Sequence, residues 1–344
     1  MEYDIVLINK LLELENNSPI GLAEGKMGVC IYFFIVGREK NNIKYIKHAE
    51  NMLDNIFNNI DKIHSVDILN GYTGIGLGVD YLISNNYVKG NINEVLGDID
   101  SYICKCLGYE KNYDKLPSLF MLHLLFYICK RLENVSIDKH LRIIFQELAI
   151  NIINYSCTKF TQDTLNEPLA FNLSYMLPQL LYVLSKLHSL SFYNYKINKI
   201  VEELSYSVLT LIPRLHSNRL YLAWGVSCLE KLVDDQNWTN HLNILKREID
   251  LYQIINNEIK DCNSSFYNGY AGILYLVEQL GESFFNANIK NWKVELLKKI
   301  EFSDIWGHYL NNSKFFNNNI GLFNGFCGIS IAYLCLKRQL IKKI

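Results

Sequence analysis

Four carboxylates could take part in acid–base chemistry. Glu24 lies in a short glycine-containing run, Asp67 lies three residues before another, Asp80 lies inside an apolar stretch, and Glu167 is the fourth. Paired carboxylates hydrolyse glycosidic bonds, and a carboxylate without a partner in an apolar helix is costly and titrates abnormally. A glycoside hydrolase is therefore one alternative. Sugar-binding sites, however, usually carry several tryptophans and acids, whereas the glycine-containing runs of this chain carry mostly Asn and Tyr.

Cysteine and histidine, the usual zinc ligands, are present but scattered. The chain has nine cysteines and eight histidines, without paired ligand spacing. Cys104 and Cys106 form C-x-C, not the C-x-x-C of a zinc or redox site, and we interpret them as ordinary helix residues. An odd number of unpaired cysteines fits reduced thiols, so we expect a cytoplasmic protein.

Four short runs with similar glycine spacing identify the elements that must position these residues. Each run precedes a strongly apolar stretch, which suggests a sharp helix entry with close backbone approach. They are Glu24-Gly25-Lys26-Met27-Gly28, Asn70-Gly71-Tyr72-Thr73-Gly74, Asn268-Gly269-Tyr270-Ala271-Gly272 and Asn324-Gly325-Phe326-Cys327-Gly328.

The runs belong to a repeat of about fifty residues. Apolar segments without the glycines, at 118–132, 174–187 and 224–233, fill the gaps between them, which makes seven units. Each apolar segment is followed by an amphipathic one, such as Ile46 to Ile60 or Ile197 to Leu211. A helix that is apolar on every side is buried, and an amphipathic helix faces water on one side. We therefore predict seven helical hairpins.

Seven such hairpins close most naturally into a ring, because an open solenoid needs polar units at both ends. The sequence thus predicts an all-α fold, an α/α toroid, forming a single domain over residues 1–344. In a toroid the loops before the inner helices surround one opening, where a ligand would bind. The side chains expected at this opening are Asn70, Tyr72, Trp224, Tyr267, Asn268, Tyr270 and Asn324.

Composition excludes other classes of protein. Of the 344 residues 49% are hydrophobic and 20% charged, and the net charge is −1 with both signs mixed. The basic stripe of a nucleic-acid binder is missing, so we expect no nucleic-acid partner. The longest apolar run, at 119–129, is too short for a membrane span, and the first residues lack the pattern of a signal peptide.

The chain resembles the LanC family (lanthionine synthetase C-like proteins) along essentially its whole length. Asp67 to Gly74 is similar to the family's D-x-x-x-G-x-x-G signature, and Gly21 to Gly28 and Gly321 to Gly325 also resemble LanC-like segments. The resemblance implies peptide modification of the lanthipeptide type. Enzymes of the family bind zinc through two cysteines and a histidine, and the metal activates a cysteine thiol that adds to a dehydrated Ser or Thr.

This sequence departs from the family at those three ligands. Tyr267 and Asn268 replace the cysteine and histidine of the C-H-G segment. The remaining cysteine position is Gly225 if the tryptophans are aligned, or Ala223 if the glycines are. None of these side chains is a usual zinc ligand, so we predict no zinc and no other cofactor. A displaced site built from Cys262, His216 and Cys228 would require that they converge.

Three other positions correspond to functional residues of the family. Asp67 matches its acidic residue, Tyr175 stands where it has a histidine that is a candidate general acid, and Arg219 loosely matches an arginine upstream of the W-C segment. A capping role for Asp67 is equally open.

The first hypothesis is a zinc-free pseudoenzyme that binds a peptide or partner protein, for instance a precursor peptide or a modifying enzyme, through an aromatic-rich opening. In the alternative reading these aromatic rings only fill the centre of the toroid. The other hypotheses are the hydrolase and a cyclase that works without metal through Asp67 and Tyr175, by holding the reacting groups together.

Overall fold

The computed structural model describes residues 2–14, 18–108, 110–159, 165–233, 235–259, 263–285 and 289–341. Within these ranges every regular element is a helix and no residue lies in a β-strand, so the prediction of an all-α fold is confirmed. None of the described helices combines the length and the apolar character that a membrane span requires.

The chain divides into two compact units. Unit 1 comprises Met1–Ile103, Asp261–Gly272 and Lys293–Ile344, and unit 2 comprises Cys104–Lys260 and Ile273–Trp292. The single domain over residues 1–344 stays a prediction.

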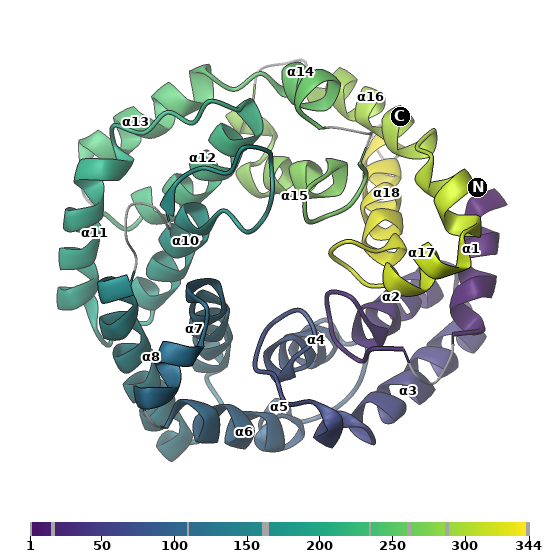
Figure 1. Ribbon diagram of the computed structural model, residues 1–344, viewed down its shortest axis with the longest axis horizontal. Coiled ribbons are helices and arrows are strands. Elements are labelled where there is room, and N and C mark those ends of the chain that lie inside the picture. The colour runs from purple at the N-terminus through teal and green to yellow at the C-terminus, as the bar shows by residue number, and fades with distance from the viewer. Residues whose placement is uncertain are drawn as a thin grey trace. The chain divides into compact units, whose positions relative to one another are not determined.

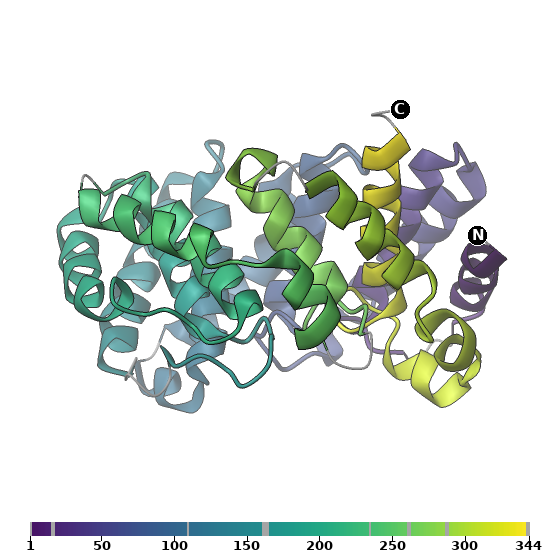
Figure 2. The ribbon, with the colours of Figure 1, turned by 90° about the horizontal axis from the view of Figure 1, so that it is seen from above.

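The helical elements of unit 1 follow the expected alternation of long apolar and amphipathic segments. They are α1 (Glu2–Leu12), α2 (Lys26–Glu39), α3 (Ile43–Phe57), η1 (Ile60–Lys62), α4 (Tyr72–Ser84), α5 (Ile92–Val95), η6 (Ile305–Tyr309), α17 (Ser313–Asn318) and α18 (Phe326–Ile341). Figure 2 shows α18, in yellow, as one continuous helix.

Unit 2 continues the same pattern. It contains η2 (Glu110–Lys115), α7 (Ser118–Glu133), α8 (Lys139–Lys159), α10 (Met176–Ser189), α11 (Asn194–Val208), α12 (His216–Glu230), α13 (Gln236–Arg247), α14 (Leu251–Gln253), η3 (Ile254–Glu258) and η5 (Glu282–Phe284). Three helices have residues in both units: α6 (Gly97–Leu107), α15 (Tyr270–Leu280) and α16 (Ile289–Glu301).

The core of unit 1 forms around α2. This helix packs against α3, α4 and α18, and Figure 1 shows it among them. Eleven of its fourteen residues are buried, whereas α3 buries only Ala49, Met52 and Ile56. Gly37 allows the two helices to approach closely, since a Cβ at this position would lie only 2.8 Å from Ile46 Cγ1. The predicted pairing of an apolar helix with an amphipathic one therefore holds here.

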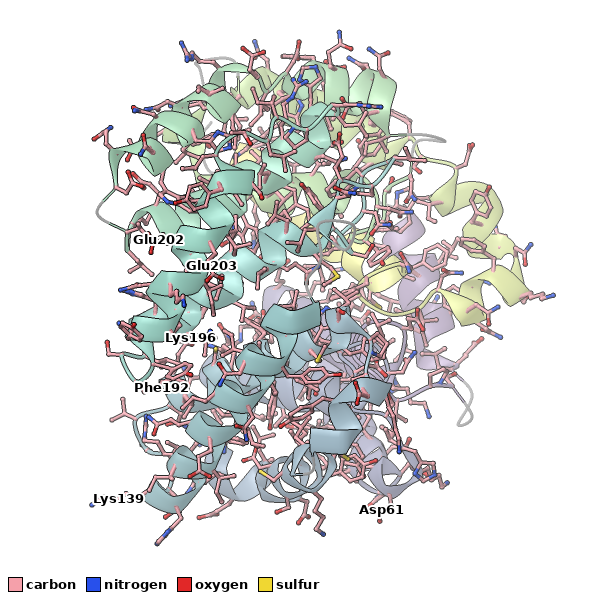
Figure 3. All side chains as sticks on the ribbon, turned by 60° about the vertical axis from the view of Figure 1, so that its left-hand side comes forward. Asp61, Lys139, Phe192, Lys196, Glu202 and Glu203 are labelled. Atoms are coloured by element: carbon pink, nitrogen blue, oxygen red, sulfur yellow. The ribbon has the colours of Figure 1, made fainter. Side chains whose placement is uncertain are left out.

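Unit 2 is built in the same way. The apolar helix α10 packs between α7 and α12. On their other sides α7 packs against α8 and α12 packs against α13, as Figure 1 shows. α11 buries Ile197, Ile200, Val201 and Val208. Its opposite face is charged, and Figure 3 shows Lys196, Glu202 and Glu203 on this helix.

The helix α12 begins earlier than the sequence indicates. We expected an apolar segment at 224–233, but the helix spans His216–Glu230. Glu258 fixes this start: its carboxylate accepts the N–H groups of His216 (2.7 Å) and Ser217 (2.8 Å). A negative side chain satisfies free N–H groups at a helix N-terminus and complements the helix dipole. Trp224 therefore lies in the middle of a helix and not at its start.

The buried His241 on α13 makes the stability of the protein sensitive to mild acid. It is 3% exposed, its Nε2 has no hydrogen-bond partner among the described residues, and burial lowers its pKa. As pH falls below the unfolded pKa of about 6.5, the unfolded chain gains the proton first and stability is lost. This group should remove at most about 1.4 kcal/mol of unfolding free energy per pH unit.

Urea unfolding of wild type and His241→Gln between pH 7.5 and 5.5 measures this contribution. The variant should lose less stability than wild type over that range. Equal pH slopes for the two proteins would refute the assignment.

Candidate functional site

The four glycine-containing runs form the same loop, and all four loops lie in unit 1. In each loop the first residue of the following helix donates its N–H to a carbonyl seven residues earlier. The bonds are Lys26 to Pro19 (2.8 Å), Tyr72 to Ser65 (3.0 Å), Tyr270 to Asn263 (2.9 Å) and Phe326 to Asn319 (2.9 Å). A helix therefore follows each run, as expected, and it begins within the run, after Gly25, Gly71, Gly269 or Gly325.

The glycines allow the loop to fold back onto the first turn of its helix. A Cβ at Gly74 would lie 2.2 Å from the carbonyl oxygen of Ile68, and one at Gly328 would lie 1.8 Å from that of Leu322. Both glycines are the last of their run, and both oxygens belong to the residue six positions earlier. No side chain fits at such distances, which explains the glycine spacing.

Backbone hydrogen bonds join the four loops to one another. The residue two positions before the first glycine of each run donates its N–H to the carbonyl of the corresponding residue in the next loop. These bonds run from Tyr267 to Phe323 (3.0 Å), from Phe323 to Ala23 (3.0 Å) and from Ala23 to Leu69 (2.9 Å). We call this series the loop ladder.

Asp67 forms one end of the loop ladder. The N–H of Leu69, which would continue the series, donates instead to Asp67 Oδ1 (2.7 Å), and so does the N–H of Asn70 (2.8 Å). Ser65 donates its hydroxyl to the other oxygen of the same carboxylate. Asp67 is 7% exposed. Its carboxylate thus has a structural task, as in the capping role that the sequence left open.

Beside the loop ladder lies a row of polar side chains, each just before the first glycine of its run. Asn70 donates to Glu24 Oε2 at 2.6 Å, so these two loops are also joined by side chains. Asn268 Oδ1 accepts from Ser265 Oγ (2.7 Å) and Asn263 Nδ2 (2.8 Å), although the residue is exposed. The fourth member of the row is Asn324, which is half-buried.

Aromatic rings accompany this row. Phe266 and Phe323 stack with their centroids 6.0 Å apart, and these two residues and Tyr267 are half-buried. The sequence analysis missed Phe266 and Phe323. Their distance from the next glycine could have revealed them, because Phe323 occupies the same position in its run as Tyr267.

Two other predicted members of the opening are buried. Tyr72 is 5% exposed and its ring stacks on Tyr102 at 3.9 Å, and Tyr270 is 1% exposed. Their positions as the first residues of α4 and α15 direct the rings into the core of unit 1. A ligand in contact with the loops would therefore meet Tyr267 and Phe323 before either of these tyrosines.

The remaining predicted residues lie in unit 2. Tyr175, Tyr221, Trp224 and Tyr182 form a continuous series of ring contacts with centroid separations of 6.1, 5.7 and 4.8 Å. The Tyr175 hydroxyl is buried and has no hydrogen-bond partner among the described residues. Burial and, to a lesser degree, the Glu167 carboxylate raise the pKa of Tyr175. The phenol therefore remains protonated at neutral pH and could donate a hydrogen bond but not accept a proton as a base.

Arg219 is held by backbone carbonyls. Its guanidinium donates to the carbonyls of Pro213 (2.6 Å), Arg214 (3.0 Å) and Glu248 (2.6 Å). The group thereby fastens the chain before α12 and the chain after α13 to the first turn of α12. This arrangement is typical of a structural arginine.

The residues at the family's zinc positions do not fit a zinc ion. A Cβ at Gly225 would lie 2.8 Å from Pro178 Cα, so Gly225 is a packing contact between α12 and α10 with no room for a cysteine. Ala223 and Gly225 have no donor atom in their side chains, and the Asn268 oxygen is already bonded. Of the residues of the displaced site, Cys262 lies outside the described residues, and His216 binds the Glu248 carbonyl (2.9 Å). Across the described ranges no three His, Cys, Asp or Glu side chains are grouped as metal ligands.

Comparison with known proteins finds similarity at the level of structure. No protein-family model matches the chain, and no curated protein matches it. Among solved structures the chain is similar to nisin cyclase, with a TM-score of 0.68 and 11% sequence identity over 98% of this chain and 94% of that one. The fold is therefore that of nisin cyclase, an α/α toroid, and the predicted fold class is confirmed.

The loop geometry predicts a large cost for a side chain at Gly328. Gly328→Ala forces the Leu322 carbonyl away from the first turn of α18, and overpacking of this kind costs about 1–3 kcal/mol of unfolding free energy. Gly97→Ala is the matched control, because nothing lies within 4 Å of a Cβ there. Urea unfolding should separate the two variants, and equal stability would contradict the loop geometry.

The structural task of Asp67 predicts different results for two substitutions. Asp67→Asn keeps an oxygen that accepts the N–H groups of Leu69 and Asn70, whereas Asp67→Ala leaves both without it. Loss of such a cap costs about 0.5–2 kcal/mol, so the alanine variant should be clearly the less stable in thermal unfolding. If both variants keep full stability, the loop ladder does not depend on this carboxylate.

Proposed function

We propose that this chain is a LanC-like protein of peptide modification that binds a peptide or partner protein at the loop ladder. Three observations support the proposal. The fold is that of nisin cyclase, the loops that resemble LanC segments are joined into one surface, and this surface presents aromatic and amide side chains. The loop ladder is the observation that carries the proposal, because it fixes the places of Phe323, Tyr267, Asn324 and Asn268.

The chemistry of the surface suits a peptide. Asn side chains donate and accept hydrogen bonds, as peptide groups do, and aromatic rings supply contact area at a low entropic cost. Tyr267 and Phe323 contribute backbone groups to the ladder, so their side chains are carried by ordered backbone. A preorganised surface of this kind loses little conformational freedom on binding.

The proposed protein acts without the family's zinc. Zinc would activate a thiol for addition, which is the chemistry the resemblance implies. The side chains at the three ligand positions offer an amide, a phenol and either hydrogen or methyl, none of which is a usual zinc donor. We therefore propose a binding pseudoenzyme and not a zinc cyclase.

Metal-free cyclisation through Asp67 and Tyr175 is a weaker proposal. A general base needs a free carboxylate, whereas that of Asp67 already accepts three hydrogen bonds. The raised pKa of Tyr175 keeps its phenol protonated, which makes it a weak acid and prevents it from acting as a base. These two residues therefore suit a protein that binds a peptide better than one that catalyses its cyclisation.

Peptide selection tests the proposal. A displayed library of random twelve-residue peptides selected on the wild-type protein should yield binders, whose affinity is then measured by calorimetry. Phe323→Ala and Asn268→Ala should each weaken binding at least about tenfold, the loss expected for a residue at the centre of an interface. Asn51→Ala, an exposed asparagine on α3, is the control and should leave the affinity unchanged.

Two results would contradict the proposal. Binders that are insensitive to both loop variants would place peptide recognition elsewhere on the molecule. A stoichiometric zinc content in the purified protein, measured by mass spectrometry, would overturn the argument from the ligand positions.

A further inference from the structure

A cavity lies in unit 2, lined by residues of α10, α11 and α13 and of the segment before α13. Its volume is about 370 Å³. Val201 and Trp238, which are 3% and 1% exposed, form an apolar floor. Two acidic residues from different elements, Glu202 and Asp235, also line it, together with His188 of α10. Nothing in the proposed peptide site uses this cavity.

Of the charged residues on α11, Glu202 lines the cavity and the two lysines do not. Successive residues of a helix are about 100° apart. Asn198, Glu202 and Ser205 therefore share the side of the helix that lines the cavity. Lys196 is turned away from it, by about 120° to 180° around the helix from these three residues, and Lys199 lies about 60° to 120° from them. The cavity side of α11 is thus acidic although the helix as a whole carries both signs.

Asp235 places its carboxylate at the cavity because it caps α13. One oxygen accepts the N–H of Asn237 at 2.9 Å, which orients the side chain. A carboxylate held in this way needs no further ordering when it binds a cation. An apolar floor with carboxylates above it suits a side chain that has an aliphatic stem and a positive end.

Two exposed tyrosines lie on the same helix as Glu202. Tyr195 and Tyr206 are 87% and 77% exposed on α11. They are eleven residues apart, so they lie within about 20° of each other around the helix and within about 40° of Glu202. Exposed tyrosines are typical of protein interfaces and not of sites for free small ions. Figure 3 shows Glu202 on this helix together with its neighbour Glu203.

We propose that this cavity receives an arginine or lysine side chain of a partner protein, whose neighbouring residues cover Tyr195 and Tyr206. The volume is at the small end of ligand sites, which suits one side chain better than a large cofactor. Opposite charge supplies the recognition, through hydrogen bonds between the cationic end and the two carboxylates. This docking surface is independent of the loop ladder.

A short basic peptide provides the test. The probe is an acetylated and amidated pentapeptide of sequence alanine–leucine–arginine–leucine–alanine, and its control has citrulline, a neutral isostere, in place of arginine. Binding is followed by NMR through the indole N–H signal of Trp238, which is assigned by its loss in Trp238→Phe. We expect saturable shifts with the arginine peptide and none with the citrulline peptide.

Substitutions on α11 identify the site. Glu202→Gln should weaken binding roughly fivefold, the upper range for an exposed charge pair, and Asp235→Asn, which keeps the helix cap, should have a similar effect. Glu203→Gln is the matched control, because its side chain lies about 100° around the helix from Glu202, and it should leave binding unchanged. Equal effects of Glu202→Gln and Glu203→Gln would overturn the proposal.

The nature of the occupant is tested separately. Free argininamide should bind more weakly than the peptide, and Tyr206→Ala should reduce only the affinity of the peptide. Equal affinities of argininamide and peptide would show a small-cation site and would overturn the protein partner. Absence of saturable binding by either probe would overturn the site itself. Since no loop residue is changed, these results are independent of the peptide site in unit 1.

Discussion

The loop ladder is the interaction on which the candidate site depends. Its three backbone hydrogen bonds, with a fourth from the Phe266 N–H to the Phe323 carbonyl, connect four loops whose residues lie as far apart in sequence as Ala23 and Phe323. They form because each loop has the same fold, which puts one N–H and one carbonyl of each equivalent residue where the neighbouring loops can reach them. Glycine makes this possible, since a Cβ at Gly328 would overlap the Leu322 carbonyl. The four loops are therefore joined mainly through backbone atoms, which constrains most of their side chains little.

Backbone contacts of this kind constrain where glycine must stand more than they constrain the other side chains. The glycines allow the tight loops before the helices, whereas the side chains on those loops are less constrained by the backbone. At 11% identity to nisin cyclase, the shared α/α toroid fold rests on apolar helices and glycine contacts that many sequences satisfy. Polar side chains that the sequence marked as functional are used for structure: the carboxylate of Asp67 accepts two N–H groups, and the guanidinium of Arg219 in α12 donates to three carbonyls.

Much of the fold could be predicted from the sequence because the repeat is local. The glycine runs located the starts of α2, α4, α15 and α18 to within a few residues. The start of α12 could not be found in this way, because Glu258, which caps it, lies over forty residues away. The burial of Tyr72 was equally hidden, since it depends on Tyr102 in another helix. The residue types predicted that the loops form a binding site. Which of their side chains are exposed to a ligand depends on contacts between distant segments.

Hydrogen exchange tests the central claim most directly. The amide protons of Ala23, Phe323 and Tyr267 should exchange as slowly as those inside α2, because each is held by a neighbouring loop, and a bound peptide should slow exchange in the same loops. Fast exchange of these three amides in a protein whose α2 is protected would show that the loops are independent of one another, and the account of the site would then be wrong.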